Sequence, residues 1–343
     1  MSSQRSEPAE LGRLRCDMVA FSNDSPSILK SGDISADEVI GAIEHEAGFL
    51  PQIELAYEAP IKAVWVTLRP EPKPVFTYDL LRSLNAVHHA VWTLWGSQES
   101  YANSPVRFLA FRGRGPVLTL GGDLDFYLDC LAKGDRAALS EYARASAEGV
   151  CWNASSARGA AITLSTVQGK AYGGGIDAPC SCNVVVAEQQ ASFCYPEVKF
   201  NHFPITAVSV LSRRAGARNA NKILSSGKEY SVDEFEAMGA LDAVAPTGEG
   251  ENWLRRYAAD TLPMHSARLS LFVAFHRNAG KLEEELAPLA KMWTDSMMRL
   301  NPMQISRLQR LAQGQERMLQ YAFASSAPNT VSGSPTAVSS AEH

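Results

Sequence analysis

The sequence predicts an α/β core followed by a largely helical C-terminal part. Up to Pro204, short apolar runs typical of strands alternate with stretches whose apolar residues recur at helical spacing. After Pro204 the pattern becomes helical, and only a strand-like run at 242–244 interrupts it. This order is typical of an α/β sheet to which a helical layer has been added.

Each element follows from a local pattern. Apolar residues that alternate or run together predict paired strands at 53–57 and 63–68, and further strands at 107–111, 161–167, 184–187 and 191–194. Helical spacing predicts helices at 77–95 and 137–152, and then near 205–225, 231–238, 250–261, 265–278 and 281–319.

Four segments are expected along the chain: an N-terminal extension over 1–45, an α/β core over 46–248, a helical part over 249–321 and a disordered tail over 322–343. Within the extension, Ser35 is followed three residues later by Glu38, which predicts a short helix with a capping box. The tail is rich in Ser, Ala, Pro and Thr, a composition that buries too little apolar surface to fold.

Composition and charge narrow the functional classes. The 343 residues are 45% hydrophobic and 20% charged, which is ordinary for a globular protein. The formal net charge is −5 and no basic stripe stands out, which disfavours nucleic acid as a partner. The six cysteines form no CxxC pair or zinc-like spacing, so we expect no metal, and reduced thiols in a cytoplasmic protein. No signal peptide follows Met1, and no apolar run approaches the roughly 18 residues of a membrane helix.

The strongest local motif is Gln168-Gly-Lys-Ala-Tyr-Gly-Gly-Gly-Ile-Asp177. A predicted buried strand runs into three glycines, and a helix is expected to follow. Glycines let a ligand approach backbone N–H groups closely, and a helix N-terminus adds free donors, which suits an anion or a carbonyl about to become one. A glycine-rich turn built for tight packing explains this stretch equally well. The GxGxxG pattern of dinucleotide sites is not matched.

A second glycine motif, Leu118-Thr-Leu-Gly-Gly-Asp123, also follows a strand and precedes a helical stretch. It is able to supply a second backbone N–H, and two converging N–H groups make an oxyanion hole. The alternative is a plain surface turn.

Two carboxylates accompany these glycines. Glu197, in Tyr195-Pro-Glu-Val198, lies in a mainly apolar run, where a carboxyl group should have a raised pKa and take part in proton transfer. For a lone glutamate the plainer interpretation, a solvated or turn-capping residue, carries more weight. Asp177, near a helix start, has the alternative of simply favouring the helix dipole. His202 is interpreted as a satisfied core residue.

Taken together, these motifs resemble the crotonase (enoyl-CoA hydratase/isomerase) superfamily. Gly121-Gly-Asp123 resembles its first oxyanion loop, Ala171-Tyr-Gly-Gly-Gly-Ile-Asp177 its second, and Phe193-Cys-Tyr-Pro-Glu-Val198 the segment with its second catalytic acid. The resemblance implies a ClpP/crotonase-like fold, with a ββα spiral core and a helical C-terminal part that forms trimers. It also assigns the site: an oxyanion hole of Gly122 and Gly174, catalytic Asp177 and Glu197, and substrate-binding Leu120, Gly121, Gly173, Gly175 and Pro196.

Within that superfamily, four segments resemble the diffusible signal factor synthases: 134–144, 181–188, 196–204 and 224–231. This narrower resemblance implies dehydration or hydration of a 3-hydroxyacyl (enoyl) thioester, and thioester hydrolysis that releases an unsaturated fatty acid. The implied substrate carrier is CoA or acyl carrier protein, with no cofactor, and the implied assembly is a homotrimer or a dimer of trimers.

Three residues depart from the pattern. Asp177 stands where the hydratases and signal synthases have Glu, which shortens the acid by about 1.5 Å. Dienoyl-CoA isomerases share this Asp, but their further downstream Asp falls near Ile205 here. Pro179 and Thr206 stand where small residues are expected, and should alter the pocket. A crotonase-fold isomerase or hydratase of specialised metabolism, and a non-catalytic acyl-binding relative, therefore remain as alternatives.

Overall fold

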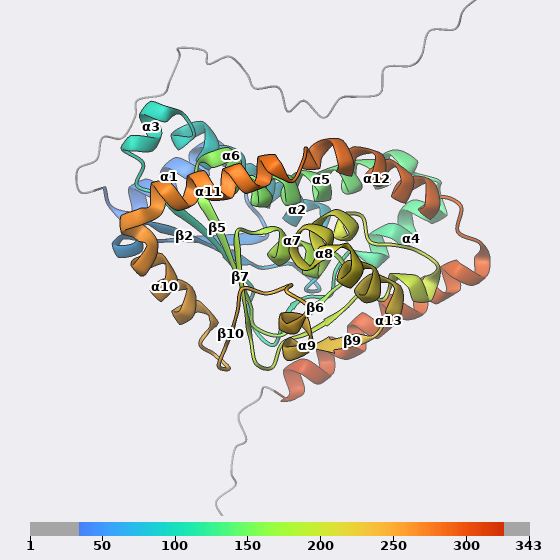
Figure 1. The fold of residues 1–343 in the computed structure, drawn as a ribbon. Helices are drawn as coiled ribbons and strands as arrows, with labels where there is room; N and C mark the ends of the chain where they lie inside the picture. The colour runs from blue at the N-terminus through green and yellow to red at the C-terminus, as the bar shows by residue number, and fades with distance from the viewer. Residues whose placement is uncertain (1–33, 326–343) are drawn as a thin grey trace, which may run out of the picture.

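The computed structural model describes residues 34–325 and has two sheets at its centre (Figure 1). The larger sheet has six strands, in the spatial order β1 (Ile53–Glu58), β2 (Ala63–Leu68), β3 (Phe108–Arg112), β5 (Ile162–Val167), β7 (Val184–Glu188) and β10 (Ala243–Ala245). The predicted pairing of the first two strands is confirmed, since β1 and β2 run antiparallel. The others pair in parallel, and β2, β5 and β7 are buried along their whole length, as parallel strands covered on both faces should be.

The smaller sheet has four strands, in the order β4 (Val117–Thr119), β6 (Lys170–Tyr172), β8 (Ser192–Cys194) and β9 (Glu229–Ser231). Each of β4, β6 and β8 directly follows a strand of the larger sheet, and a helical segment comes next: α4 (Leu124–Lys133), α7 (Gly174–Ser181) and η2 (Glu197–Phe200). This repeated strand–strand–helix unit is the expected ββα spiral. It brings the ends of β4, β6 and β8 to one edge.

Helices cover both faces of the larger sheet (Figure 1). On one face lie α1 (Ala36–Ala47), α2 (Tyr78–Trp95) and α5 (Arg136–Ala154); on the other lie α10 (Gly250–Thr261) and α11 (His265–Asn278). The remaining helices are α3 (Gln98–Ala102), α6 (Ser156–Gly159), α8 (Ala207–Ser226), α9 (Val232–Ala237), α12 (Leu282–Met297) and α13 (Pro302–Ser325). The predicted capping box of α1, between Ser35 and Glu38, is confirmed.

One predicted helix is wrong. The stretch 281–319 forms two helices, α12 and α13, separated at 298–301. Pro302 is the first residue of α13, a position where a missing N–H costs nothing. Just before it, Asn301 and Gln304 cap each other's backbone N–H groups at 2.9 and 3.0 Å. The turn lets α13 fold back along α4 and η2.

The predicted segment boundaries stay predictions, but the structure bears on two of them. Most of the extension 1–45 lies outside the described residues, and its described end forms α1, whose Val39 and Ile43 are completely buried against α2 and the sheet. The tail expected over 322–343 begins inside α13, which reaches Ser325, and the rest of it lies outside the described residues.

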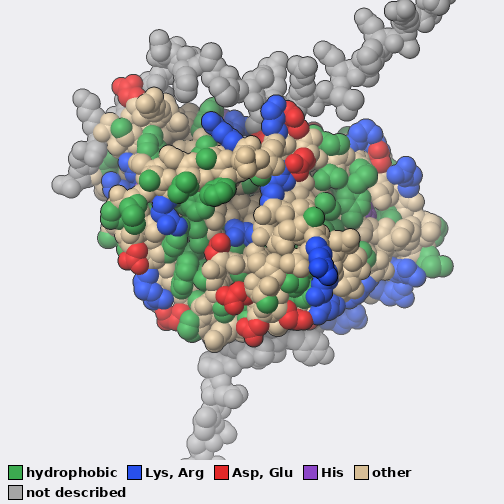
Figure 2. All heavy atoms as spheres, viewed as in Figure 1, with side chains coloured by type: hydrophobic (Ala, Val, Ile, Leu, Met, Phe, Trp, Pro, Cys, Tyr) green, Lys and Arg blue, Asp and Glu red, His purple; other side chains and the backbone are tan. Residues whose placement is uncertain are grey.

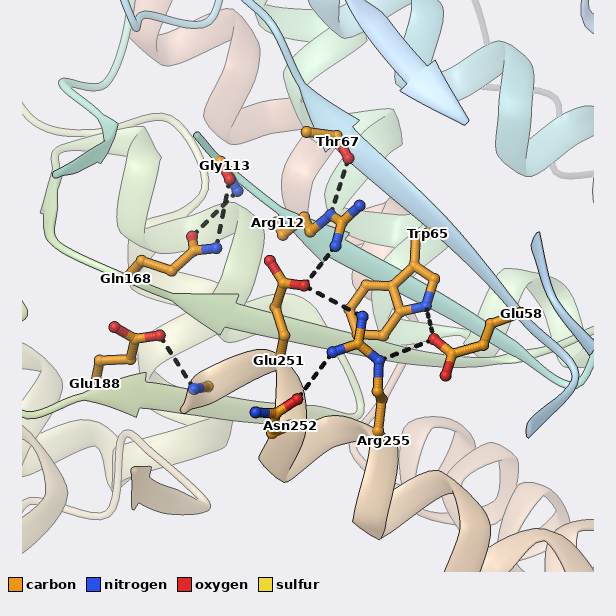
Figure 3. A network of polar contacts seen from close by, with 11 residues as sticks. Glu58, Trp65, Thr67, Arg112, Gly113, Gln168, Glu188, Glu251, Asn252 and Arg255 are labelled. Carbon is orange, nitrogen blue, oxygen red and sulfur yellow. Dashed lines mark hydrogen bonds and ion pairs between the residues drawn. The ribbon is translucent and has the colours of Figure 1, made fainter. Parts of the chain in front are cut away.

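A polar network ties α10 to the larger sheet (Figure 3). Arg112 on β3 contacts Glu251 at 2.5 Å, and Arg255 on α10 contacts Glu58 at 3.0 Å. The Trp65 indole N–H donates to the same Glu58 carboxylate at 2.8 Å. The helix α10 is thus held on the core by charge-assisted hydrogen bonds in addition to the packing of its apolar face.

Across residues 34–325, no helix combines the length and apolar character required to cross a bilayer. The same residues contain no group of His, Cys, Asp and Glu side chains arranged to hold a metal ion.

Candidate active site

Two glycine turns meet where β4 and β6 end. The first contains Gly121, which has a φ of +89°, and a Cβ there would lie 2.6 Å from the carbonyl oxygen of Tyr172. The second leads into α7, where a Cβ on Gly175 would lie 2.5 Å from Thr119 Cγ2. Only glycine allows this approach, so the tight-packing interpretation holds for these two positions. The packing also keeps the two turns side by side.

Gly122 and Gly174 present N–H groups that the fold leaves unused. The Gly122 N–H has no hydrogen-bond partner among the described residues, because Phe76 pairs with the turn through the carbonyl of Gly121, at 2.7 Å. Gly174 is the first residue of α7, where an N–H has no acceptor within the helix. Both residues line one cavity, and the positive end of the α7 dipole lies at its wall. This is the arrangement expected of an oxyanion hole, a role that stays a prediction.

Asp177 lies in the first turn of α7 and is 1% exposed. The Tyr195 hydroxyl donates to its Oδ1 at 2.5 Å, and the Thr206 hydroxyl donates to its Oδ2 at 2.6 Å. Burial raises the pKa of Asp177 to about 6, while the hydrogen bonds from Thr206 and Tyr195 act to lower it. At neutral pH the side chain is therefore mostly a carboxylate, and each oxygen keeps a lone pair for a water or a substrate.

Glu197 is the first residue of η2, directly after β8. The residue as a whole is half-buried, but its Oε2 is buried and has no hydrogen-bond partner. Its Oε1 lies close to Gly173, where a Cβ would come within 2.5 Å of it. Burial raises the pKa of Glu197 to about 8; its own backbone N–H opposes this, and the charge of Asp177 adds to it. Glu197 therefore keeps its proton at neutral pH.

The two acids thus differ in protonation state. Two carboxyl groups whose environments separate their pKa values are the usual basis for one acid and one base in the same site. Because the charge of Asp177 contributes to the raised pKa of Glu197, the two groups titrate as a coupled pair.

A cavity of about 120 Å³ connects these groups. Gly122, Gly174, Asp177 and Glu197 all line it. Most of the remaining wall is apolar or aromatic, including Leu68, Phe76, Leu81, Leu84, Phe111, Leu118, Leu124, Tyr127, Tyr142, Val150, Phe200, Phe203, Ile205, Trp293 and Met297. A wall of this kind suits a hydrocarbon chain attached to a polar head.

The five predicted substrate-binding residues lie behind this wall. Leu120, Gly121, Gly173, Gly175 and Pro196 do not line the cavity. Leu120 is buried in a small apolar cluster with Val75, Val117, Tyr172 and Cys194. The glycines hold the turns together, so in the structure these residues support the site.

The C-terminal helix α13 also reaches the first turn. Gln315 is 6% exposed, and its side-chain amide donates to the carbonyl of Leu120 at 2.9 Å. Lys73 pairs with both Asp125 on α4 and Glu316 on α13, at 2.5 and 3.0 Å. The turn that presents Gly122 is therefore held by a helix nearly two hundred positions later in the sequence.

Sequence reasoning missed the partners of Asp177. Tyr195 lies within the motif that identified Glu197, but nothing in that motif indicates a bond to Asp177. Thr206 did carry a signal, because it was one of the three departures from the family pattern. His202 is buried as expected, but the expectation that it is satisfied is wrong, since its Nε2 has no hydrogen-bond partner. Nothing in the sequence indicated Gln315.

Comparison with known proteins finds enoyl-CoA hydratase/isomerase-type enzymes among those similar to this chain. Residues 141–299 match the family model of enoyl-CoA hydratase/isomerase. The chain is 26% identical over 186 residues to mevalonyl-coenzyme A hydratase SIDH of Beauveria bassiana, covering 52% of this chain and 66% of that protein. It is 33% identical over 82 residues to the bacillaene synthase dehydratase PksH of Bacillus subtilis, covering 24% and 32%. The chain therefore spans between a third and two thirds of the length of these relatives.

Solved structures share the fold at lower identity. An enoyl-CoA hydratase from Bacillus halodurans matches with a TM-score of 0.64 at 18% identity, over 76% of this chain and 99% of that one. Human mitochondrial delta3-delta2-enoyl-CoA isomerase matches with a TM-score of 0.61 at 14% identity, over 80% and 100%. The expected ClpP/crotonase-like fold is confirmed.

Proposed function

We propose that the chain is a member of the crotonase (enoyl-CoA hydratase/isomerase) superfamily and that it catalyses the reversible hydration of a 2-enoyl thioester. One observation carries the proposal. A single apolar cavity holds two unused N–H groups, a carboxylate and a protonated carboxyl group, contributed by the ends of β4, β6 and β8.

The thioester carbonyl would accept hydrogen bonds from the N–H groups of Gly122 and Gly174. When water adds at C3, negative charge moves onto that oxygen, and fixed donors stabilise it; losing one such donor typically costs roughly 2.7–4 kcal/mol. The turns are rigid because their glycines are packed on each other, so the donors need no rearrangement as charge develops.

The two acids would complete the addition. The carboxylate of Asp177 takes a proton from the water that attacks C3, and the carboxyl group of Glu197 gives its proton to C2. The resting protonation states, with a pKa of about 6 for Asp177 and about 8 for Glu197, suit this direction. Dehydration of the 3-hydroxyacyl thioester is the same path in reverse. Tyr195 and Thr206 orient Asp177 throughout.

We further propose that the same hole supports thioester hydrolysis, as the resemblance to diffusible signal factor synthases implies. Water attack at the carbonyl carbon places negative charge on the same oxygen, so the donors serve both reactions. Collapse of this intermediate breaks the C–S bond, and the carrier leaves as its thiol with the proton that the attacking water gives up. Segments 134–144, 181–188, 196–204 and 224–231 support this part of the proposal. The carrier of the acyl chain is CoA or acyl carrier protein.

A second candidate is double-bond isomerisation. Both oxygens of Asp177 already accept hydroxyl hydrogen bonds, whereas Glu197 Oε2 has no partner. A single carboxylate is sufficient to take the proton from C2 of a 3-enoyl thioester and return it to C4, and Glu197 would do this in its ionised form.

Product analysis separates these functions. The protein is incubated with 2-enoyl, 3-enoyl and 3-hydroxyacyl thioesters on CoA and on acyl carrier protein, and products are identified by mass spectrometry. Interconversion of the 2-enoyl and 3-hydroxyacyl thioesters supports hydration, and free unsaturated acid supports added hydrolysis. Conversion of 3-enoyl to 2-enoyl thioester without hydration supports isomerisation. If the protein binds the thioesters but converts none of them, the result supports a non-catalytic acyl-binding relative.

We propose that the protein assembles as a homotrimer or a dimer of trimers. Hydrophobic side chains gather on the surface around α11 (Figure 2), where Met264, Leu271 and Phe275 are 56%, 58% and 69% exposed. Large apolar side chains that are exposed next to one another are typical of subunit interfaces. Light scattering after size exclusion tests this: a mass of three or six chains supports the assembly, and a monomer contradicts it.

We also propose a cytoplasmic location. Cys130, Cys180, Cys182 and Cys194 are free thiols in the described part of the chain, as expected in a reducing compartment. Cell fractionation tests it.

A further inference from the structure

One polar atom of the cavity wall has no part in the chemistry above. His202 is 6% exposed and lines the cavity together with Glu197. Its Nε2 is buried and has no hydrogen-bond partner. A buried polar atom without a partner destabilises the fold, so a fold that keeps one at a cavity wall points to a ligand that completes it.

The hydrogen bonds of the ring define Nε2 as a donor. The Phe203 N–H donates to His202 Nδ1 at 2.7 Å. A ring nitrogen accepts only when it carries no proton, so the proton of the neutral imidazole is on Nε2. Burial lowers the pKa of His202 to about 4, which keeps the ring neutral near pH 7. A side chain of the cavity wall therefore carries an N–H without an acceptor.

A stack of aromatic rings holds this donor in place. The His202 ring stacks on Trp293 with centroids 5.4 Å apart, and Trp293 meets Tyr127 edge-on at 5.1 Å. The Tyr127 hydroxyl in turn lies beside Gly122, where a Cβ would come within 2.0 Å of it. The stack connects His202 to the turn of the oxyanion hole, and the His202 backbone N–H donates to the Glu197 carbonyl at 3.0 Å, so the ring lies beside the second acid of the site.

We propose that His202 determines specificity by donating its Nε2–H to an oxygen carried on the acyl chain, in addition to the thioester carbonyl. This inference rests on the proposed function and names its substrate class: hydroxyacyl or oxoacyl thioesters, in preference to plain alkyl chains. A plain chain would leave the donor unpaired inside an apolar wall, and a site built to hydrogen-bond an oxygen discriminates strongly against a substrate that lacks it.

Binding of matched acyl-CoA ligands tests the inference. Octanoyl-CoA, 3-hydroxyoctanoyl-CoA and 4-hydroxyoctanoyl-CoA are titrated calorimetrically into the wild-type protein, His202→Phe and His202→Gln. The wild type should bind at least one hydroxylated ligand about tenfold more tightly than octanoyl-CoA, the typical effect of one buried hydrogen bond. His202→Phe should lose this preference, because its ring has no donor. His202→Gln should keep most of it, because its amide places an N–H near the position of Nε2.

The outcomes separate this inference from the proposed function. If the wild type binds none of the three acyl chains, whether on CoA or on acyl carrier protein, both fail. If it binds all three ligands equally, or if His202→Phe keeps the preference, only the role of His202 is overturned. Equal binding of the three ligands by the wild type overturns the role of His202 without any result from the variants. Circular dichroism checks that the two variants are folded.

Discussion

Asp177 and Thr206, two residues that differ from the pattern which the resemblance implies, are direct partners in the structure. The sequence presents them as separate differences, 29 positions apart, but the Thr206 hydroxyl donates to the Asp177 carboxylate at 2.6 Å. The sequence could identify both residues, but only the fold shows that they are partners, because the contact joins α7 to the start of α8.

Lengthening the acid at residue 177 should therefore lower activity unless residue 206 is reduced as well. Asp177→Glu alone should cost roughly a hundredfold in kcat, the usual effect of about 1 Å of misplacement. Asp177→Glu with Thr206→Gly should recover much of that loss, and Thr206→Gly alone should not exceed the wild type. Steady-state kinetics with a 2-enoyl thioester measure this cycle; additive effects of the two changes would show that the residues are not coupled.

The pH dependence of hydration should report both acids. With Asp177 required as carboxylate and Glu197 as carboxyl, kcat/KM should be bell-shaped, with limbs near the pKa values of about 6 and about 8. Thr206→Val removes a hydrogen bond that lowers the pKa of Asp177, so the acidic limb should move to higher pH. Thr206→Ser keeps the hydroxyl and serves as the control. An acidic limb that stays in place in Thr206→Val would disconnect it from Asp177.

At the scale of elements, prediction worked where a signal is local and missed what long-range contacts decide. Short sequence patterns predict the buried strands and the capped helix α1, and the runs of glycine predict the two turns. The break between α12 and α13 has a local cause in Asn301 and Pro302, but the helical periodicity on both sides predicted one continuous helix. The contact of Gln315 with Leu120 spans 195 positions, so no local pattern could contain it.

The hold of α13 on the oxyanion turn should affect catalysis. Gln315→Ala leaves the carbonyl of Leu120 without its side-chain donor and loosens the turn that presents Gly122. We expect kcat to fall about tenfold, with a smaller change in KM, because the hole acts mainly on the transition state. Gln313→Ala, at an exposed position of the same helix, is the matched control and should behave as wild type. Equal kinetics for the two variants would remove α13 from the site.

At the scale of the whole molecule, the site carries a cost in stability. Burial raises the pKa of Glu197 from 4.5 to about 8, so the folded protein holds a proton that the unfolded chain releases at lower pH. The contribution of this group to stability is therefore present below about pH 4.5 and is lost as pH rises toward about 8. The raised pKa that keeps Glu197 protonated for catalysis at neutral pH therefore also lowers the stability of the fold at that pH.

Removing the carboxyl group should remove that dependence. Glu197→Gln should raise Tm relative to wild type, and the difference should grow from about pH 5 to about pH 8.5. Glu236→Gln, at an exposed position of α9, is the control and should show no such trend. Thermal unfolding followed by circular dichroism measures both; a pH-independent difference for Glu197→Gln would mean that Glu197 is not protonated in the fold.

The most direct test of the site as a whole is the fate of the proton at C2. In D₂O, hydration of a 2-enoyl thioester by the wild-type protein should place one deuterium on C2 of the 3-hydroxyacyl product, delivered by Glu197. Mass spectrometry and NMR of the product measure its amount and its position. Glu197→Gln should abolish this incorporation while still binding the thioester. A wild-type protein that places no deuterium at C2, or a Glu197→Gln variant that places it as fast as wild type, would contradict the account.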